Sequence, residues 1–198
     1  NGVEIIQQIK QETGLKIEII NGKEEAEIIY ANHIEKLIDD KQAYLYVDVG
    51  GGSTEITYFK NGNVADSRSF NIGTIRILND MVKTSKWEDL HAWLDDILKG
   101  QHVQLIGSGG NINKVAKISK KDPKEPLSYD YIKGYYDTLR SHTYEERILK
   151  LDLNPDRADV IIPAMKIFVN IMKWTKSKQI YVPKVGLADV IIKQLAGV

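Results

Sequence analysis

The chain has 198 residues, enough for one ordinary globular domain or a compact pair of domains with a buried core. Lys and Arg total 27 and Asp and Glu also total 27, so no overall field draws the protein to nucleic acid or anionic lipid, and a polyanion must be bound by a local site. The absence of cysteine excludes disulfides, thiol catalysis and cysteine-ligated zinc. No apolar run approaches the roughly 18 residues of a membrane span and no secretory signal is evident, so we expect a cytoplasmic protein.

The first half of the chain alternates helical patterns with β-rich segments. The Asn61-Gly62 pair is the strongest hairpin signal in the sequence, because both residues tolerate the positive φ of a tight turn. The expected elements, in chain order, are a helix at 3–13, a strand at 16–20, a helix at 23–37, a buried strand at 44–49, hairpin strands at 56–59 and 64–70, and helices near 74–81 and 87–98.

The second half continues the alternation, which favours an α/β fold. Its expected elements are a strand at 103–106, a polar loop at 119–128, one or two helices within 129–150, a helix at 157–175, a strand at 179–182 and a final helix from about 187. No internal repeat or interdomain linker is evident. We therefore treat residues 1–198 as a single domain.

The stretch with the clearest chemistry is Asp48-Val49-Gly50-Gly51-Gly52-Ser53-Thr54-Glu55, which lies between the expected buried strand and the hairpin. Three glycines in a tight turn let the backbone approach a ligand and aim several N–H groups at one point, as in a phosphate-binding loop. Asp48 and Glu55 bracket the turn, where a pair of carboxylates could hold Mg²⁺ or orient a water. A plain glycine-rich hairpin with exposed acids is the alternative. The two bracketing acids favour the functional interpretation.

Several segments resemble, in order, those of the exopolyphosphatase/guanosine pentaphosphate phosphohydrolase family, which belongs to the superfamily of actin, sugar kinases and heat-shock ATPases. The Asp48–Glu55 loop is similar to the phosphate loop of that family's second domain. The other similar segments are Thr13-Gly14, Gly22-Lys23-Glu24-Glu25-Ala26, Ser69 to Arg76 as Ser-x-x-x-Gly-x-x-Arg, Gly107-Ser108-Gly109-Gly110, Arg157-Ala158-Asp159 and Gly186-Leu187.

The resemblance implies a ribonuclease H-like (actin-like ATPase) domain with a mixed sheet flanked by helices. It also implies that the chain is the second domain of a two-domain phosphatase, with the first domain absent. By resemblance the final helix would return to that first domain. Its apolar face would then be exposed or covered by a second copy of the chain, giving a homodimer; the residues of that face are Leu187, Val190, Ile191 and Leu195.

The resemblance also implies roles for individual residues. Glu25 corresponds to the catalytic acid that orients or deprotonates the attacking water, although an acid in a first helical turn is an ordinary structural feature. Asp48 and Glu55 would bind the metal, Mg²⁺ or Mn²⁺. The phosphate-binding groups would be Gly50, Gly51, Gly52 and Ser53.

The glycines and arginines elsewhere are less specific. For Gly109 and Gly110, lining of the cleft and a tight strand-to-helix packing turn are equal alternatives. For Arg76 and Arg157 we favour salt bridges over phosphate contacts.

Two departures from the family pattern bear on function. Glu27 and Ala188 stand where the family usually has arginine, so two cations near a polyanion are missing. The leading hypothesis is a metal-dependent hydrolase of polyphosphate or guanosine pentaphosphate, nearly inactive as the isolated chain. A non-catalytic sensor of phosphate compounds is the main alternative, and a kinase of the same superfamily is a weaker third.

Overall fold

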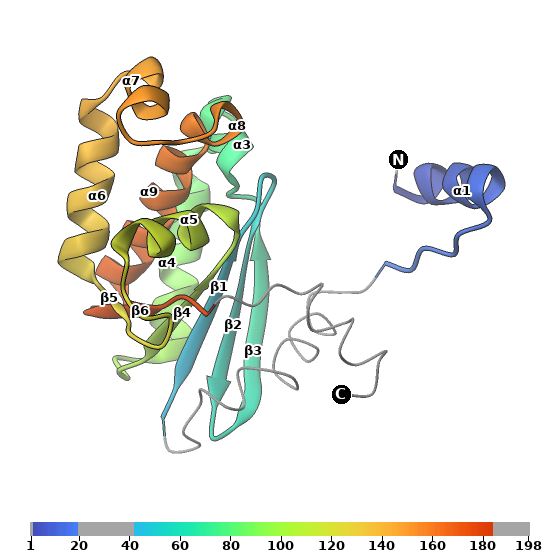
Figure 1. Ribbon diagram of the computed structural model, residues 1–198. Helices are drawn as coiled ribbons and strands as arrows, with labels where there is room; N and C mark the ends of the chain where they lie inside the picture. The colour runs from blue at the N-terminus through green and yellow to red at the C-terminus, as the bar shows by residue number, and fades with distance from the viewer. Residues whose placement is uncertain (1, 20–41, 184–198) are drawn as a thin grey trace.

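The computed structural model describes residues 2–19 and 42–183 of the chain. Within this part, the strands form one mixed sheet in the order β3-β2-β1-β4-β6-β5 (Figure 1). β1 runs parallel to β4, and β4 runs parallel to β6, while the other neighbours are antiparallel. The strands are β1 (Tyr44–Val49), β2 (Thr54–Lys60), β3 (Asn63–Phe70), β4 (Gln104–Ser108), β5 (Leu127–Ser128) and β6 (Gln179–Tyr181).

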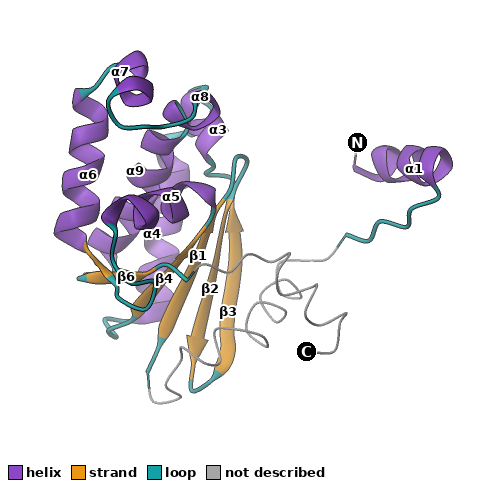
Figure 2. Ribbon diagram, viewed as in Figure 1, coloured by secondary structure: helices purple, strands orange, loops and turns teal. Residues whose placement is uncertain are grey.

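The described helices after β3 gather on one side of the sheet, as Figure 2 shows. They are α3 (Thr74–Leu78), α4 (Thr84–Leu98), α5 (Gly110–Ser119), α6 (Tyr129–Ser141), α7 (Tyr144–Leu149), α8 (Pro155–Ala158) and α9 (Ile161–Trp174). A further helix, α1 (Gly2–Thr13), precedes them, and none of its residues is buried. None of the helices in the described ranges is long and apolar enough to cross a membrane.

Helix α9 is the centre of the core. It is apolar around most of its circumference, as expected for a helix surrounded by other elements. Helices α3, α4, α5, α6 and α8 all pack against it. Below it lies the face of the sheet formed by alternate strand residues such as Leu45, Val47 and Ile56, each fully buried. This packing fixes the sheet edge at which β1 and β4 end.

The hairpin expected at Asn61-Gly62 is confirmed. Asn61 has φ 52° and Gly62 has φ 73°, and two consecutive positive φ values give a turn whose twist matches that of the flanking strands. The β2–β3 register shifts by one residue at a bulge between Tyr58 and Phe59. The bulge decides which β3 side chains lie opposite the first residues of β2.

The α/β fold class and the mixed sheet are confirmed, as are the helix over 3–13 and most elements expected between residues 44 and 182. Two expectations there are wrong: the loop expected at 119–128 ends in the short strand β5, and the single helix expected at 157–175 is two helices, α8 and α9. The strand expected at 16–20 is wrong over its described residues, since residues 14–19 have no regular secondary structure. Ile17 and Ile19 are 41% and 72% exposed, and a strand is stable only beside a neighbour. The helices expected at 23–37 and from 187 lie outside the described residues.

Phe168 tests the core. Its side chain is 1% exposed on α9 and lies under Gly107 of β4, where a Cβ would come within 3.2 Å of the ring. We expect Phe168→Ala to lower the free energy of unfolding by about 3–5 kcal/mol, because it leaves a cavity. Urea unfolding followed by circular dichroism measures this loss. Leu149→Ala is the control, since Leu149 is 83% exposed and should change stability by less than about 0.5 kcal/mol. Equal losses of unfolding free energy in Phe168→Ala and Leu149→Ala would contradict the central place of Phe168 in the core.

Candidate phosphate-binding site

The glycine-rich segment forms the loop between β1 and β2, at the end of the sheet's central strand. Gly50 donates its N–H to the carbonyl of Ser53 at 3.0 Å, which closes the loop into a compact turn. Gly50, Gly51 and Gly52 are exposed, whereas Val49 and Thr54 on either side are buried in the strands. The loop is therefore presented to solvent from a rigid base, as expected from the sequence.

The first turn of α3 holds the carbonyl side of this loop. Thr74 N–H donates to Gly50 O at 3.0 Å, and Ile75 N–H donates to Gly51 O at 2.9 Å. Arg76 adds its side chain, whose Nε donates to Gly52 O at 2.7 Å. Helix α3 has no side-chain N-cap, so the loop carbonyls satisfy donors that a helix start otherwise leaves unpaired.

Gly73 permits this contact. A Cβ at Gly73 would lie 2.3 Å from Gly51 O and 2.4 Å from the carbonyl carbon of Gly52. Gly73 has φ −129°, an extended conformation open to any residue, so the requirement for glycine is one of space alone. Thr54 Oγ1 fastens the same region from β2 by donating to Ile72 O at 2.6 Å.

The N–H side of the loop is left open. Three loop carbonyls are engaged by α3, but within the described ranges no group accepts a hydrogen bond from the backbone N–H of Gly51, Gly52 or Ser53. Exposed N–H groups in consecutive residues form a concavity suited to an anion. This arrangement distinguishes the loop from an ordinary glycine-rich turn.

Asp48 and Glu55 are direct neighbours at the base of the loop. They are paired across the antiparallel β1–β2 ladder, which places both side chains on one face with Cβ atoms roughly 4.5–5.5 Å apart. Glu55 Oε1 accepts from Ser53 Oγ at 2.6 Å and from Ser69 Oγ at 2.9 Å. The two hydroxyls orient one carboxylate oxygen of Glu55, while its Oε2 has no hydrogen-bond partner among the residues the structure describes.

The second glycine cluster packs against the same end of β1. Gly109 has φ 112°, which favours glycine, and a Cβ there would lie 2.8 Å from Val49 O and 3.4 Å from Asp48 Oδ1. This contact supports the packing interpretation of Gly109 and also brings α5 beside Asp48. The register places Ser108 of β4 opposite Asp48 on the side away from Glu55.

The salt bridges expected for Arg76 and Arg157 are wrong within the described part of the chain. Arg76 donates to Gly52 O, and Arg157 Nη1 donates to Gly110 O. Each guanidinium lies beside a glycine, and because glycine has no side chain its carbonyl oxygen is accessible to the arginine. Both arginines thus stabilise the glycine turns rather than pairing with a carboxylate.

The acids at the loop suit a hard cation. Mg²⁺ is commonly held by one or two carboxylates together with waters and substrate phosphate oxygens, and Asp48 and Glu55 supply such a pair beside open N–H groups. Within residues 2–19 and 42–183, no group of three or more His, Asp or Glu side chains gathers as an all-protein metal site. The residues present therefore fit a metal shared with a phosphate ligand.

The structure brings together six of the seven residues singled out from the sequence: Asp48, Gly50, Gly51, Gly52, Ser53 and Glu55. Glu25 lies outside the described residues. Ser69, Gly73 and Thr74 belong to the Ser69–Arg76 segment, which had no role assigned from the sequence, and the structure shows that they support the loop and Glu55. Their spacing directly after the hairpin was the available signal.

The mixed six-stranded sheet with its helices is the fold of the actin-like class. The sequence model of the Ppx/GppA phosphatase family matches residues 1–196, and the chain belongs to this family.

Two curated relatives are similar in sequence. The bifunctional 3-dehydroquinate synthase/phosphatase of Fusobacterium nucleatum is 28% identical over 194 residues, covering 85% of this chain. A Haemophilus influenzae protein provisionally named an exopolyphosphatase is 26% identical over 188 residues, covering 84% of this chain. This chain spans 29% of the first relative and 56% of the second.

The fold is also that of solved structures. An exopolyphosphatase from Cytophaga hutchinsonii superposes with a TM-score of 0.78 at 22% identity, covering 100% of this chain and 71% of that one. The Aquifex aeolicus Ppx/GppA family member superposes with a TM-score of 0.74 at 24% identity, covering 99% and 69%. At these identities the similarity shows the fold.

Gly73→Ala tests the contact between α3 and the loop. The added Cβ overlaps loop backbone, so we expect a loss of about 1–3 kcal/mol in the free energy of unfolding and faster amide exchange at Thr74 and Ile75. Gly134→Ala in α6 is the matched control, because nothing lies within 4 Å of its Cβ and alanine favours the helix. Urea unfolding and hydrogen exchange measure both effects. An unchanged Gly73→Ala protein would contradict the contact.

Proposed function

We propose that this chain carries the phosphate-binding loop and metal-binding acids of a metal-dependent hydrolase that releases phosphate from polyphosphate or guanosine pentaphosphate. The proposal rests on how the backbone hydrogen-bonding groups of the Gly50–Ser53 loop are arranged. Its carbonyls are held by α3, and its Gly51, Gly52 and Ser53 N–H groups have no acceptor within the described residues. Membership of the Ppx/GppA phosphatase family supports the same reaction class.

The residues have complementary roles in this proposal. The loop N–H groups bind the oxygens of a terminal phosphate, and Asp48 and Glu55 hold Mg²⁺ or Mn²⁺, which neutralises phosphate charge when bound. Phosphoryl transfer depends mainly on positioning and charge stabilisation, so these groups suffice to bind and orient the substrate. Glu25, by its resemblance to the family's acid, orients or deprotonates the attacking water.

The chain also covers only part of its relatives, about 70% of the two solved structures and less of the curated proteins. We propose that it corresponds to the second domain of a two-domain phosphatase, and that a second domain must close over the loop for turnover. The isolated 198-residue chain would then bind phosphate compounds but hydrolyse them very slowly. Robust turnover by this chain alone would contradict that assignment.

A sensor of phosphate compounds is the second candidate. It is favoured by Glu27 and Ala188, which stand where the family pattern usually has arginine, so the chain lacks two positive charges of that pattern. A sensor would retain the loop and bind the same compounds without releasing phosphate. Hydrolysis therefore separates the two functions, whereas binding does not.

Phosphate release by the intact protein, with Mg²⁺ and either polyphosphate or guanosine pentaphosphate, is the direct test. We expect Glu25→Ala to reduce release by at least about 100-fold, the lower range for loss of a general base. Asp48→Asn should raise the Mg²⁺ concentration needed for half-maximal release, because a neutral amide binds the cation less strongly. Glu145→Ala, an exposed acid on α7, is the control and should leave the rate unchanged. Binding without release in the unaltered protein would favour the sensor.

A further inference from the structure

A second concentration of charge lies outside the loop, on α5 and the segment after it. Residues 114–124 contain five lysines, in a chain with no net charge. Three of them, Lys114, Lys117 and Lys120, recur at intervals of three residues. Positions three apart form one ridge on a helix, and each step advances roughly 4.5 Å along the axis. Lys114 and Lys117 lie on such a ridge of α5, and Lys120 is the C-cap residue just past the end of the helix, with φ 55°. These three side chains are called the lysine row.

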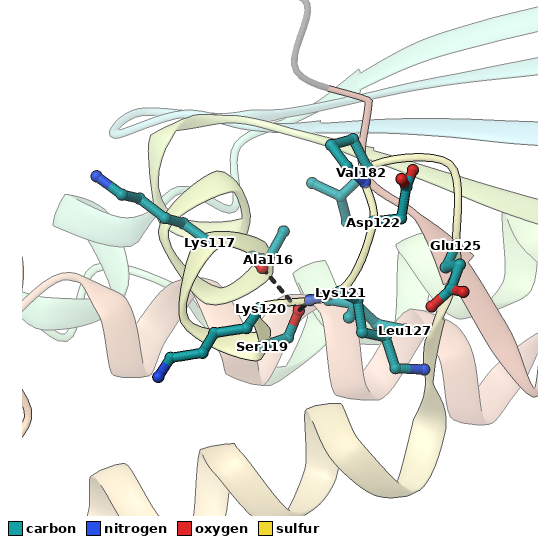
Figure 3. A pocket seen from close by; sticks show the side chains of 10 residues that line it. Ala116, Lys117, Ser119, Lys120, Lys121, Asp122, Glu125, Leu127 and Val182 are labelled. Carbon is teal, nitrogen blue, oxygen red and sulfur yellow. Dashed lines mark hydrogen bonds between the residues drawn. The ribbon is translucent and has the colours of Figure 1, made fainter.

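This row borders two adjoining depressions. One is lined by Gly110, Lys114, Lys117, Asn154 and Arg157, among others. The other, drawn in Figure 3, is lined by Lys117, Lys120, Lys121 and the loop that follows. Lys117 lines both, so the two depressions meet at this side chain.

The helix that carries the row begins beside the end of β1, at the base of the phosphate loop. Gly110 opens α5, and a Cβ on the preceding Gly109 would lie 2.8 Å from Val49 O and 3.4 Å from Asp48 Oδ1. Arg157 anchors this helix start by donating to Gly110 O. The start of α5 thus lies beside the base of the phosphate loop, and the lysine row follows along the helix from that start.

Neighbouring acidic side chains do not neutralise the charge of Lys117 and Lys120. Figure 3 shows Lys117 and Lys120 extending to one side of the depression, with Asp122 and Glu125 on the other side. Neither lysine forms an ion pair with a residue in the described ranges, and both are exposed. Lys114 is partly engaged, since its Nζ donates to Asp152 O at 2.8 Å and lies 3.9 Å from the Asp152 carboxylate.

We propose that Lys114, Lys117 and Lys120 form a path for a linear polyphosphate chain whose end occupies the Gly50–Ser53 loop. The inference rests on the proposed function and selects one of its two substrate classes. Successive cations along α5 and at its C-cap match a polymer that carries charge on every unit. Among the residues that the structure describes, no aromatic side chain lines either depression, so these residues offer no surface on which a guanine base could stack.

The test compares Lys117→Gln/Lys120→Gln with Lys173→Gln/Lys178→Gln, which removes equal charge from the lysines near the end of α9 and the start of β6. Binding of long-chain polyphosphate and of tripolyphosphate to the 198-residue chain is measured with Mg²⁺ at several salt concentrations. We expect the first pair to weaken binding of the long chain by roughly 3- to 30-fold, the range for two exposed charge contacts. Binding of tripolyphosphate should change less than about twofold, and the control pair should change neither.

Equal losses in the two double variants, equal losses for the two ligands, or no binding of long-chain polyphosphate by the unaltered chain would each overturn the path. The salt dependence gives a second readout, because loss of two contacts should reduce the slope of log affinity against log salt by roughly 1.4. Failure of the proposed hydrolysis is a separate result. If the intact protein releases no phosphate, yet Lys117→Gln/Lys120→Gln selectively weakens binding of the long chain, the result would support the path and contradict the proposed hydrolysis.

Discussion

The contact between the start of α3 and the β1–β2 loop is the constraint on which the site depends. A helix start has N–H groups without partners, and a glycine-rich loop has carbonyls without partners. Here the N–H groups of Thr74 and Ile75 donate to the carbonyls of Gly50 and Gly51, at 3.0 and 2.9 Å. Gly73, which has no side chain, lets the two backbones approach this closely. Because the carbonyls are fixed on this side, the N–H groups of Gly51, Gly52 and Ser53 remain for an anion.

The sheet supplies the second requirement, acids at the base of the loop. The β1–β2 register pairs Asp48 with Glu55, and the β2–β3 register places Ser69 opposite Glu55, where its hydroxyl orients the carboxylate. On the other side of β1, Gly109 brings the start of α5 next to Asp48. The loop, the acids and the start of α5 thus adjoin one another at the ends of β1 and β4, and the proposed path continues from there along the lysine row.

Much of this was predictable because it depends on local sequence. The Asp48–Glu55 motif follows an apolar strand and precedes an Asn-Gly hairpin, which was enough to locate the loop and both acids. Ser69 was not predictable. A two-residue turn at Asn61-Gly62 without a bulge would place Arg68 opposite Glu55, and the bulge between Tyr58 and Phe59 shifts Ser69 into that position. The carbonyl contacts of Arg76 and Arg157 depend on tertiary packing, which explains why ion pairs were wrongly favoured.

The central claim is that the backbone N–H groups of Gly51, Gly52 and Ser53 bind phosphate. A ¹H–¹⁵N NMR titration of the chain with tripolyphosphate and Mg²⁺ tests it most directly. We predict saturable shifts that are largest at these three amides, with smaller shifts at Thr74 and Ile75, whose N–H groups are already bonded to the loop. Saturable binding that leaves the three amides unperturbed, or no binding at all, would contradict the account.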